Sequence, residues 1–316
     1  MKFFFLLIAM NSFAKDIIVA VIDTGADQNH PAIAPHLWKN PGEIPENGLD
    51  DDGNGKIDDV YGWNFADDSS DITDNHGHGT HISGLITSSG NKKIRIMILK
   101  YYQPGAPRDA VTASLLAIEY AVQMKVDIIN YSAGGNRPDA RELAAIRRAE
   151  RAGVVVVAAA GNEGQNADKV PFFPASYPLS NVISVAAVDT QNQLLSSSNW
   201  GISSVFIAAP GKSLFSALPG NRWGPLSGTS QATAVVTAEI ANWISQFVDK
   251  PDISEIREQL ARTTLKTAEL KGKNSTGGVL SPRKMQHSRN TNFSQGGRRV
   301  STKNKRFALS SAEIFN

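Results

Sequence analysis

The sequence of 316 residues contains no cysteine. It therefore has no disulfide bonds, and a protein of this composition that leaves the cell needs another source of robustness, for which bound calcium is a common solution. Aromatic residues make up only 8% of the chain, and no apolar run after the N-terminus is long enough to cross a membrane. The length and apolar content allow a large core, which we expect to belong to one α/β domain followed by a tail.

The N-terminus has the pattern of an export signal. Residues 1–14 contain one lysine, an apolar run, and small residues at the minus-three and minus-one positions of a cleavage point after Ala14. This pattern predicts a short secretory signal peptide. The alternative, a buried first strand, is disfavoured because a second apolar run, residues 17–22, follows at once. We therefore expect a secreted protein, either periplasmic or extracellular.

Positive charge is concentrated at the C-terminal end. From Lys271 onward there are ten Lys or Arg residues and one acidic residue, whereas the preceding 270 residues carry 22 basic and 29 acidic side chains. A basic segment rich in Ser, Asn and Gly on an acidic body is typical of solvated disorder, which we predict for residues 287–316. Contact with nucleic acid or membrane is the alternative, and no interleaving of aromatic residues supports it. We expect a monomer without a nucleic-acid partner.

Short apolar runs alternate with segments of helical period. Several runs are continuous rather than alternating, as in a parallel sheet that is buried on both faces. The predicted helices are residues 110–125, residues 140–153 and a long helix after Gly228. The pattern predicts a single domain over residues 15–286 with a doubly wound, mostly parallel sheet flanked by helices, and a site at the C-terminal ends of the strands. The predicted strands are residues 17–22, 94–99, 126–131, 154–160, 181–188 and 204–209.

Residues 74–84, DNHGHGTHISG, hold three of the six histidines. A zinc site of the His-Glu-x-x-His type needs two histidines four residues apart with a glutamate between them, and His76, His78 and His81 do not offer this. A helix predicted to begin near Gly79 places His78 at its N-terminus. A single histidine there is more often structural than catalytic, so its interpretation depends on partners elsewhere in the chain.

Further polar residues lie at the positions where a site is expected in such a sheet, at the C-terminal ends of strands or the start of the following helix. Asp23 directly follows the first strand, and Ser230 begins the long helix. A carboxylate can orient an imidazole, which can take the proton of a serine that attacks a carbonyl, and the helix N-terminus supports the developing oxyanion. Alone, Asp23 and Ser230 each fit a helix cap, but together with His78 they predict a catalytic triad. Asn162 follows a buried strand, where its amide could donate to an oxyanion.

Several motifs, in this order, resemble those of the subtilisin-like serine proteases, the subtilase family. The family's histidine motif selects His78 from the three histidines, and the similarity runs from about Asp16 to Met285. The motifs are VIDTGAD, HGTHISG, INYSAGG, AAAGNEG, SGTSQATA and GKNSTGGVL. The order of aspartate, histidine and serine is that of subtilisin.

The resemblance implies a role for each polar side chain. Asp23 would orient the imidazole of His78, which acts as general base and then as general acid. Ser230 would be the nucleophile, and its backbone N–H together with Asn162 would bind the oxyanion. The implied activity is that of a secreted serine endopeptidase that hydrolyses polypeptide substrates through an acyl-enzyme intermediate. The two other histidines of the segment are then structural.

The resemblance also implies two segments that bind the substrate. One is an edge against which an extended peptide pairs, with pockets that read alternate side chains. The other walls the primary specificity pocket, and its small residues indicate a roomy pocket. These segments are Ser132, Ala133 and Gly134 for the edge, and Ala159, Ala160 and Gly161 for the pocket wall.

Two features depart from the family pattern. Gln231 and Ala234 stand where the family usually has methionine and proline, and Gln231 places a polar group beside the nucleophile. Secreted relatives generally carry a prodomain, whereas only about two residues separate the predicted cleavage point from the first strand. We expect the protein to fold without a prodomain or with help from elsewhere.

Residues 50–59, DDDGNGKIDD, predict a calcium loop. The spacing of its oxygen groups matches the first part of an EF-hand, but Tyr61 stands at the place of the terminal glutamate, so that Asp58 or Asp59 must compensate. An acidic solvated loop without a metal ion is the alternative, and a similar insert in some subtilases favours calcium. The predicted ligands are Asp50, Asp52, Asn54, the carbonyl of Lys56, and Asp58.

Two other functions compete with the protease. A catalytically silent, secreted binding protein is motivated by Gln231, Ala234 and the short N-terminal segment, but it would be free to lose the catalytic side chains, and this chain keeps all of them. An ester or lipid hydrolase is disfavoured because Ser230 is not in a G-x-S-x-G elbow.

Overall fold

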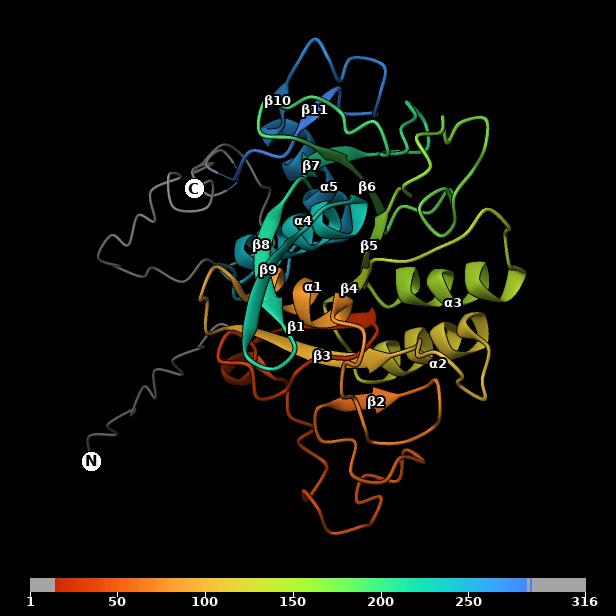
Figure 1. Cartoon of the computed structure of the whole chain (residues 1–316), viewed down its shortest axis with the longest axis vertical. Helices are drawn as coiled ribbons and strands as arrows, with labels where there is room; N and C mark the ends of the chain where they lie inside the picture. The colour runs from red at the N-terminus through yellow and green to blue at the C-terminus, as the bar shows by residue number, and fades with distance from the viewer. Residues whose placement is uncertain (1–14, 283–284, 286–316) are drawn as a thin grey trace, which may run out of the picture.

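A nine-stranded sheet runs through the centre of the protein (Figure 1). The structure, a computed structural model, describes residues 15–282 and Met285, so that the predicted signal peptide and tail lie outside the described residues. Apart from the antiparallel pair of β10 and β11, neighbouring strands are parallel. In spatial order the strands are β10 (Leu265–Lys266), β11 (Gly278–Val279), β7 (Ile207–Pro210), β6 (Val182–Val188), β5 (Val155–Ala159), β4 (Ile128–Tyr131), β1 (Ile17–Asp23), β3 (Ile94–Lys100) and β2 (Gly62–Asn64).

Helices cover both faces of this sheet, and alternate strand residues point to different cores. In β1, Val19 and Val21 belong to the core that also contains residues of α1 (His78–Thr87), α4 (Thr229–Ile244) and α5 (Ile253–Thr263). Ala20 and Ile22 point to the opposite core, which is shared with α2 (Ala110–Gln123) and α3 (Ala140–Arg151). The full burial of both faces explains the continuous apolar runs of the sequence.

The remaining elements are small and lie outside the nine-stranded sheet. A two-stranded hairpin of β8 (Leu214–Leu218) and β9 (Arg222–Leu226) packs on α1, and a short 3₁₀ helix, η1 (Ala34–His36), contacts β3. Within residues 15–282, no helix combines the length and the apolar character that a membrane crossing requires.

The predicted fold class is confirmed, and all six predicted strands are present with shifts of a few residues at their ends. The predicted helices correspond to α2, α3 and α4, and the helix expected near Gly79 begins at His78. Sequence reasoning missed β2, the β8–β9 hairpin, β10, β11 and α5. A signal for α5 existed: Asp252 and Glu255 form a capping box, in which Asp252 accepts from the Glu255 N–H at 2.8 Å and its own N–H donates to Glu255 at 2.9 Å.

Candidate active site

Asp23 and His78 meet at the carboxyl edge of the sheet. Asp23 is the last residue of β1 and is only 3% exposed, and its Oδ1 lies 2.7 Å from Nδ1 of His78, the first residue of α1. The same oxygen accepts from the Thr24 N–H at 2.8 Å. The carboxylate therefore fixes Nδ1 as the protonated nitrogen of a neutral His78 and leaves Nε2 as an acceptor.

The N-terminus of α1 is held in place by a second buried carboxylate, Asp74, which sequence reasoning missed. Asp74 is 3% exposed, and its two oxygens accept hydrogen bonds from five donors. These are the backbone N–H groups of His76, Gly77 and Thr80 and the hydroxyls of Thr24 and Thr80, at 2.7 to 3.0 Å. The sequence signal was an aspartate ahead of the helix, but its donors lie partly beside the end of β1 and are visible only in the fold.

Close packing brings α1 against the end of β1. A Cβ atom on Gly79 would lie 2.1 Å from the carbonyl oxygen of Gly25, so the helix can approach β1 this closely only with glycine at this position. Gly79 also donates its N–H to the hydroxyl of Thr24 at 2.9 Å. The glycine of the histidine motif thus sets the separation of Asp23 and His78.

The pKa of His78 is raised above its ordinary value of 6.5. Burial alone acts in the opposite direction, because it disfavours the charged imidazolium. The negative charge of Asp23, its hydrogen bond to the ring and the charge of Asp74 together outweigh this effect. A neighbouring carboxylate that favours imidazolium is what a general base needs when it takes a proton during catalysis.

Ser230 lies in the first turn of α4, 8% exposed. Its hydroxyl donates to the carbonyl oxygen of Ser132 at 3.1 Å, and the hydroxyl of Ser132 donates to the carbonyl of Ser230 at 3.2 Å. The buried hydrogen bonds continue to Asn130. Its amide donates to the hydroxyl of Ser132 and accepts from the hydroxyl of Thr237, which lies seven residues beyond Ser230 on α4. This network fixes α4 to the carboxyl end of β4.

The side chain of Asn162 faces the N-terminus of α4. Its Oδ1 accepts from the N–H and the hydroxyl of Thr229, at 2.9 and 3.1 Å. Because the oxygen is used in this way, the amide NH₂ group is left to donate to a ligand. A Cβ atom on Gly228 would lie 3.2 Å from Oδ1 and 3.6 Å from Nδ2 of Asn162, so this glycine keeps the approach open.

Gln231 lies next to this group and is 2% exposed. Its Oε1 would be 3.3 Å from a Cβ atom on Gly228. The amide of Gln231 is therefore inside the protein, beside Asn162, and is not turned to solvent. Ala234, at the place of the family's proline, is fully buried.

The two other histidines of the segment differ from each other. His81 is fully buried, and its Nε2 lies 3.0 and 3.2 Å from the carbonyl oxygens of Leu214 and Gly224, one on each side of the β8–β9 hairpin. Burial lowers the pKa of His81, so the neutral ring donates to these carbonyls. His76 is exposed, with its ring 6.3 Å from that of His78.

The two expected substrate-binding segments lie side by side. Ser132, Ala133 and Gly134 follow β4, and Ala159, Ala160 and Gly161 end or follow β5. These strands are paired, with Tyr131 opposite Ala158, so both segments emerge at the same edge as Asn162.

The acidic loop groups its carboxylates differently from the EF-hand spacing. Asp52 comes together with Glu43 and Asp59, whose oxygens lie within 4.8 Å of one another. Asp58 instead accepts from the N–H groups of Asn47 and Gly48 at 3.2 and 3.0 Å. Of the five predicted calcium ligands, only Asp52 is in this cluster. Asp59 was the named alternative to Asp58.

Among the other predicted ligands, the side-chain oxygens of Asp50 accept from backbone donors, whereas Oδ1 of Asn54 has no hydrogen-bond partner among the described residues. The donors to Asp50 are the N–H groups of Asn54 and Gly55. The ammonium of Lys56, whose carbonyl is the predicted ligand, lies over the rings of Trp63 and Phe65. Asn54 donates its side-chain amide to Asp59 at 2.8 Å.

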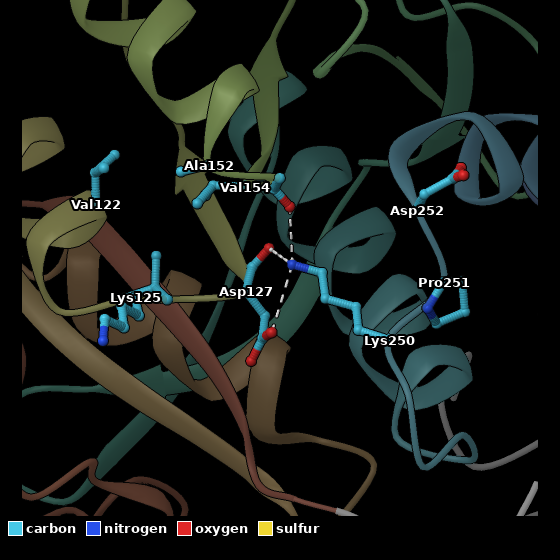
Figure 2. A pocket seen from close by; sticks show the side chains of 10 residues that line it. Val122, Lys125, Asp127, Ala152, Val154, Lys250, Pro251 and Asp252 are labelled. Atoms are coloured by element: carbon cyan, nitrogen blue, oxygen red, sulfur yellow. Dashed lines mark hydrogen bonds and ion pairs between the residues drawn. The ribbon is translucent and has the colours of Figure 1, made fainter. Parts of the chain in front are cut away.

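A cavity of about 300 Å³ lies away from the site, at the amino ends of β4 and β5 (Figure 2). The ammonium of Lys250 reaches into it and donates to the carbonyls of Asp127 and Gly153 at 2.9 and 3.0 Å, with the Asp127 carboxylate at 3.4 Å. The contacts tie the segment after α4 to the sheet.

Comparison of the sequence with known proteins identifies first the class of enzyme and then the protein family. The chain is 34% identical to the major intracellular serine protease of Bacillus subtilis (strain 168) over 271 residues, 79% of this chain and 76% of that protein. It is also 34% identical to thermitase of Thermoactinomyces vulgaris, with 72% and 73% coverage. The protein is a serine-type endopeptidase.

The sequence model described as the subtilase family matches residues 14–297, and the chain belongs to this family. Solved structures share the fold. A lanthipeptide protease superposes with a TM-score of 0.71 at 22% identity over 87% of this chain and 88% of the other. A serine-to-alanine mutant of the protease domain of PatA superposes with a TM-score of 0.66 at 26% identity over 88% and 97%.

Proposed function

We propose that this subtilase cleaves peptide bonds with Asp23, His78 and Ser230 as a catalytic triad. The observation that carries the proposal is the buried Asp23–His78 pair at 2.7 Å, at the same sheet edge as Ser230. In this mechanism the Ser230 hydroxyl would rotate about the Cα–Cβ bond, away from the Ser132 carbonyl and toward Nε2 of His78. His78 takes the hydroxyl proton as Oγ attacks the carbonyl carbon, and gives that proton to the leaving amine, which leaves an acyl-enzyme.

The oxyanion of each tetrahedral intermediate would be bound by two donors. One is the free amide NH₂ of Asn162, whose orientation is fixed by Thr229, and the other is the backbone N–H of Ser230 at the positive end of α4. Water then attacks the acyl-enzyme with His78 again as the base. Loss of one oxyanion donor costs about 10²–10³-fold in rate.

The substrate would bind as an extended strand along Ser132, Ala133 and Gly134. This edge follows β4, and Gly134 is exposed there. Backbone hydrogen bonds would hold the peptide, and the pocket walled by Ala159, Ala160 and Gly161 would take the side chain before the cleaved bond.

A fluorophosphonate probe tests the triad directly, because it labels only a serine that a neighbouring base activates. We expect the wild type to be labelled at Ser230, and Ser230→Ala and His78→Ala to remain unlabelled. Ser227→Ala is the matched control, since this exposed serine lies three residues earlier and should leave labelling unchanged. A folded wild type without label would overturn the proposed mechanism.

We further propose that Glu43, Asp52 and Asp59 hold a calcium ion. Glu43 is 9% exposed, and its Oε2 is buried without a hydrogen-bond partner among the residues that the structure describes, as is Oδ1 of Asn54. A hard cation is the partner that such buried oxygens and clustered carboxylates prefer. Calcium would supply stability there by neutralising like charges, at a distance from the reaction.

Residues 1–14 are proposed to direct export. Their apolar run and small residues before the cleavage point fit a secretory signal, although one relative is named as intracellular. N-terminal sequencing of protein recovered from the medium or periplasm would show Lys15 as the first residue. Full-length protein confined to the cytosol would refute export.

A further inference from the structure

The ring of Phe172 lies between the two segments expected to form the specificity pocket. A Cβ atom on Gly134 would lie 2.5 Å from Cε1 and 3.1 Å from Cζ of Phe172, and one on Gly161 would lie 2.9 Å from its Cγ. One end of the ring therefore touches the substrate edge and the other touches the pocket wall. The side chain is only 8% exposed, so little space is left between the glycines for another group.

The backbone around this ring is fixed to the same edge. Phe173 and Gly135 exchange a pair of hydrogen bonds, at 2.8 Å from Phe173 to the Gly135 carbonyl and 2.9 Å in return. Phe172 itself donates its N–H to the Ser176 hydroxyl at 3.1 Å and accepts from the Ser176 N–H at 2.9 Å. Because these hydrogen bonds hold the backbone at Phe172 and Phe173, the ring of Phe172 has a fixed position in the pocket.

The carboxylate of Glu163, an exposed residue, lies beside the same pocket wall. Oε2 of Glu163 would lie 2.6 Å from a Cβ atom on Gly161, and it accepts from the Asn199 side chain at 2.7 Å. Asn199 also donates to the Ala160 carbonyl at 2.9 Å, which fixes its amide beside the wall. The space next to Gly161 is thus bounded by an aromatic ring and a negative charge.

We propose that Phe172 fills the primary specificity pocket and restricts cleavage to peptides with a small, uncharged side chain, such as glycine, alanine or serine, before the cleaved bond. The proposal rests on the proposed function, because it assigns a substrate class to that site. It corrects the expectation of a roomy pocket: the small walls of Gly134 and Gly161 make room for Phe172 rather than for the substrate. A larger substrate side chain would need the volume that the ring occupies.

Matched chromogenic tetrapeptides that differ only in the residue before the scissile bond provide the test, with alanine, leucine, phenylalanine, lysine and glutamate at that position. For the wild type we expect kcat/KM to be highest for alanine. Phe172→Gly should raise the ratio of phenylalanine to alanine substrate by about 10- to 100-fold, the factor that burial of a benzyl group is worth in an apolar pocket. Phe172→Leu should give an intermediate ratio.

Phe206→Ala is the control, because it removes an aromatic ring outside the pocket. That ring packs against Arg257, whose Cζ lies 4.2 Å from the ring centroid. The ratio of phenylalanine to alanine cleavage by this variant should match that of the wild type. Labelling of each variant by the fluorophosphonate probe shows that the triad is intact. If the labelled wild type cleaves the phenylalanine substrate as well as the alanine one, the inference is wrong and the proposed function stands. A preference for lysine also overturns it, since the ring would then have to move aside for the lysine side chain to enter and reach the carboxylate of Glu163. If the wild type is neither labelled nor active, both proposals fail.

Discussion

Two buried aspartates together determine the position of His78. Asp23 contacts the ring of His78, whereas Asp74 touches only the backbone and hydroxyl groups that hold the helix start. The sequence revealed Asp23 because it follows a strand within a recognisable motif. It did not reveal Asp74: four of its five donors are local, within six residues along the chain, but the fifth, the hydroxyl of Thr24, is brought beside Asp74 only by the fold.

Replacement of Asp74 should therefore cost stability. In Asp74→Ala, several buried donors lose their acceptor, and since each unsatisfied group costs about 1–3 kcal/mol, we expect a loss of about 3 kcal/mol or more in the free energy of unfolding. Urea unfolding of the Ser230→Ala background, which avoids self-digestion, measures this. Asp71→Ala is the control: Asp71 is exposed and accepts from Thr73, and its loss should cost less than about 1 kcal/mol. Equal losses in both variants would contradict this role of Asp74.

The pH profile should report the raised pKa of His78. In the proposed mechanism His78 must be neutral to take the serine proton, so kcat/KM should fall as the pH drops through a value above 6.5, the ordinary value for histidine. The folded pKa is raised, so protonated His78 stabilises the fold below pH 6.5, and this contribution is lost as the pH rises through the folded pKa. The rate of fluorophosphonate labelling against pH measures the acid limb.

Asp23→Asn provides the comparison for this profile. Without the carboxylate the burial effect remains, so the acid limb should move to lower pH, and the rate should fall by about 10⁴-fold. An acid limb that stays in place in Asp23→Asn would show that Asp23 does not set the pKa of His78.

Among the strands, the continuously apolar ones were predictable and the very short ones were not. The runs that became β5 and β6 are apolar on both faces, which leaves a parallel sheet as their natural setting. β2 has only three residues, and β10 and β11 have two each, too few for any periodicity. Phe172 was missed for a related reason: it comes from a loop ten residues beyond Asn162, and nothing local shows that its ring turns back between two glycines.

The packing of α1 on β1 gives a prediction at this scale. Gly79→Ala would place a methyl group 2.1 Å from the Gly25 carbonyl, so the helix must move away and the Asp23–His78 contact must lengthen. We expect activity to fall by at least about 10²-fold, because a displacement near 1 Å has an effect of this size. Ser83→Ala on the same helix is the control, since its buried hydroxyl has no hydrogen-bond partner among the described residues and its loss should leave activity unchanged. Normal turnover by Gly79→Ala would refute the packing argument.

For the whole molecule, calcium should determine thermal stability. An ion that binds only the native state stabilises by about 2.7 kcal/mol at a hundredfold excess over Kd, and for a chain of this length each kcal/mol is worth about 2–4 °C in Tm. Scanning calorimetry of the Ser230→Ala protein with calcium and with a chelator should show a difference of several degrees. Glu43→Gln should reduce the difference, whereas Asp67→Asn, outside the cluster, should preserve it. An identical Tm in both conditions would reject the site.

The burial of α4 determines how this enzyme can lose its activity. Thirteen of the 16 residues of α4 are buried, with Ser230 at one end, while Lys250 ties the segment after the helix to the opposite edge of the sheet. Amide hydrogens in the middle of such a helix exchange with solvent deuterium only when the whole domain opens. A peptide spanning α4 should thus be the slowest to gain mass in an exchange experiment. Ser230, the proposed nucleophile, would stay in place through every partial opening of the surface and would be lost in a single step, together with the fold itself.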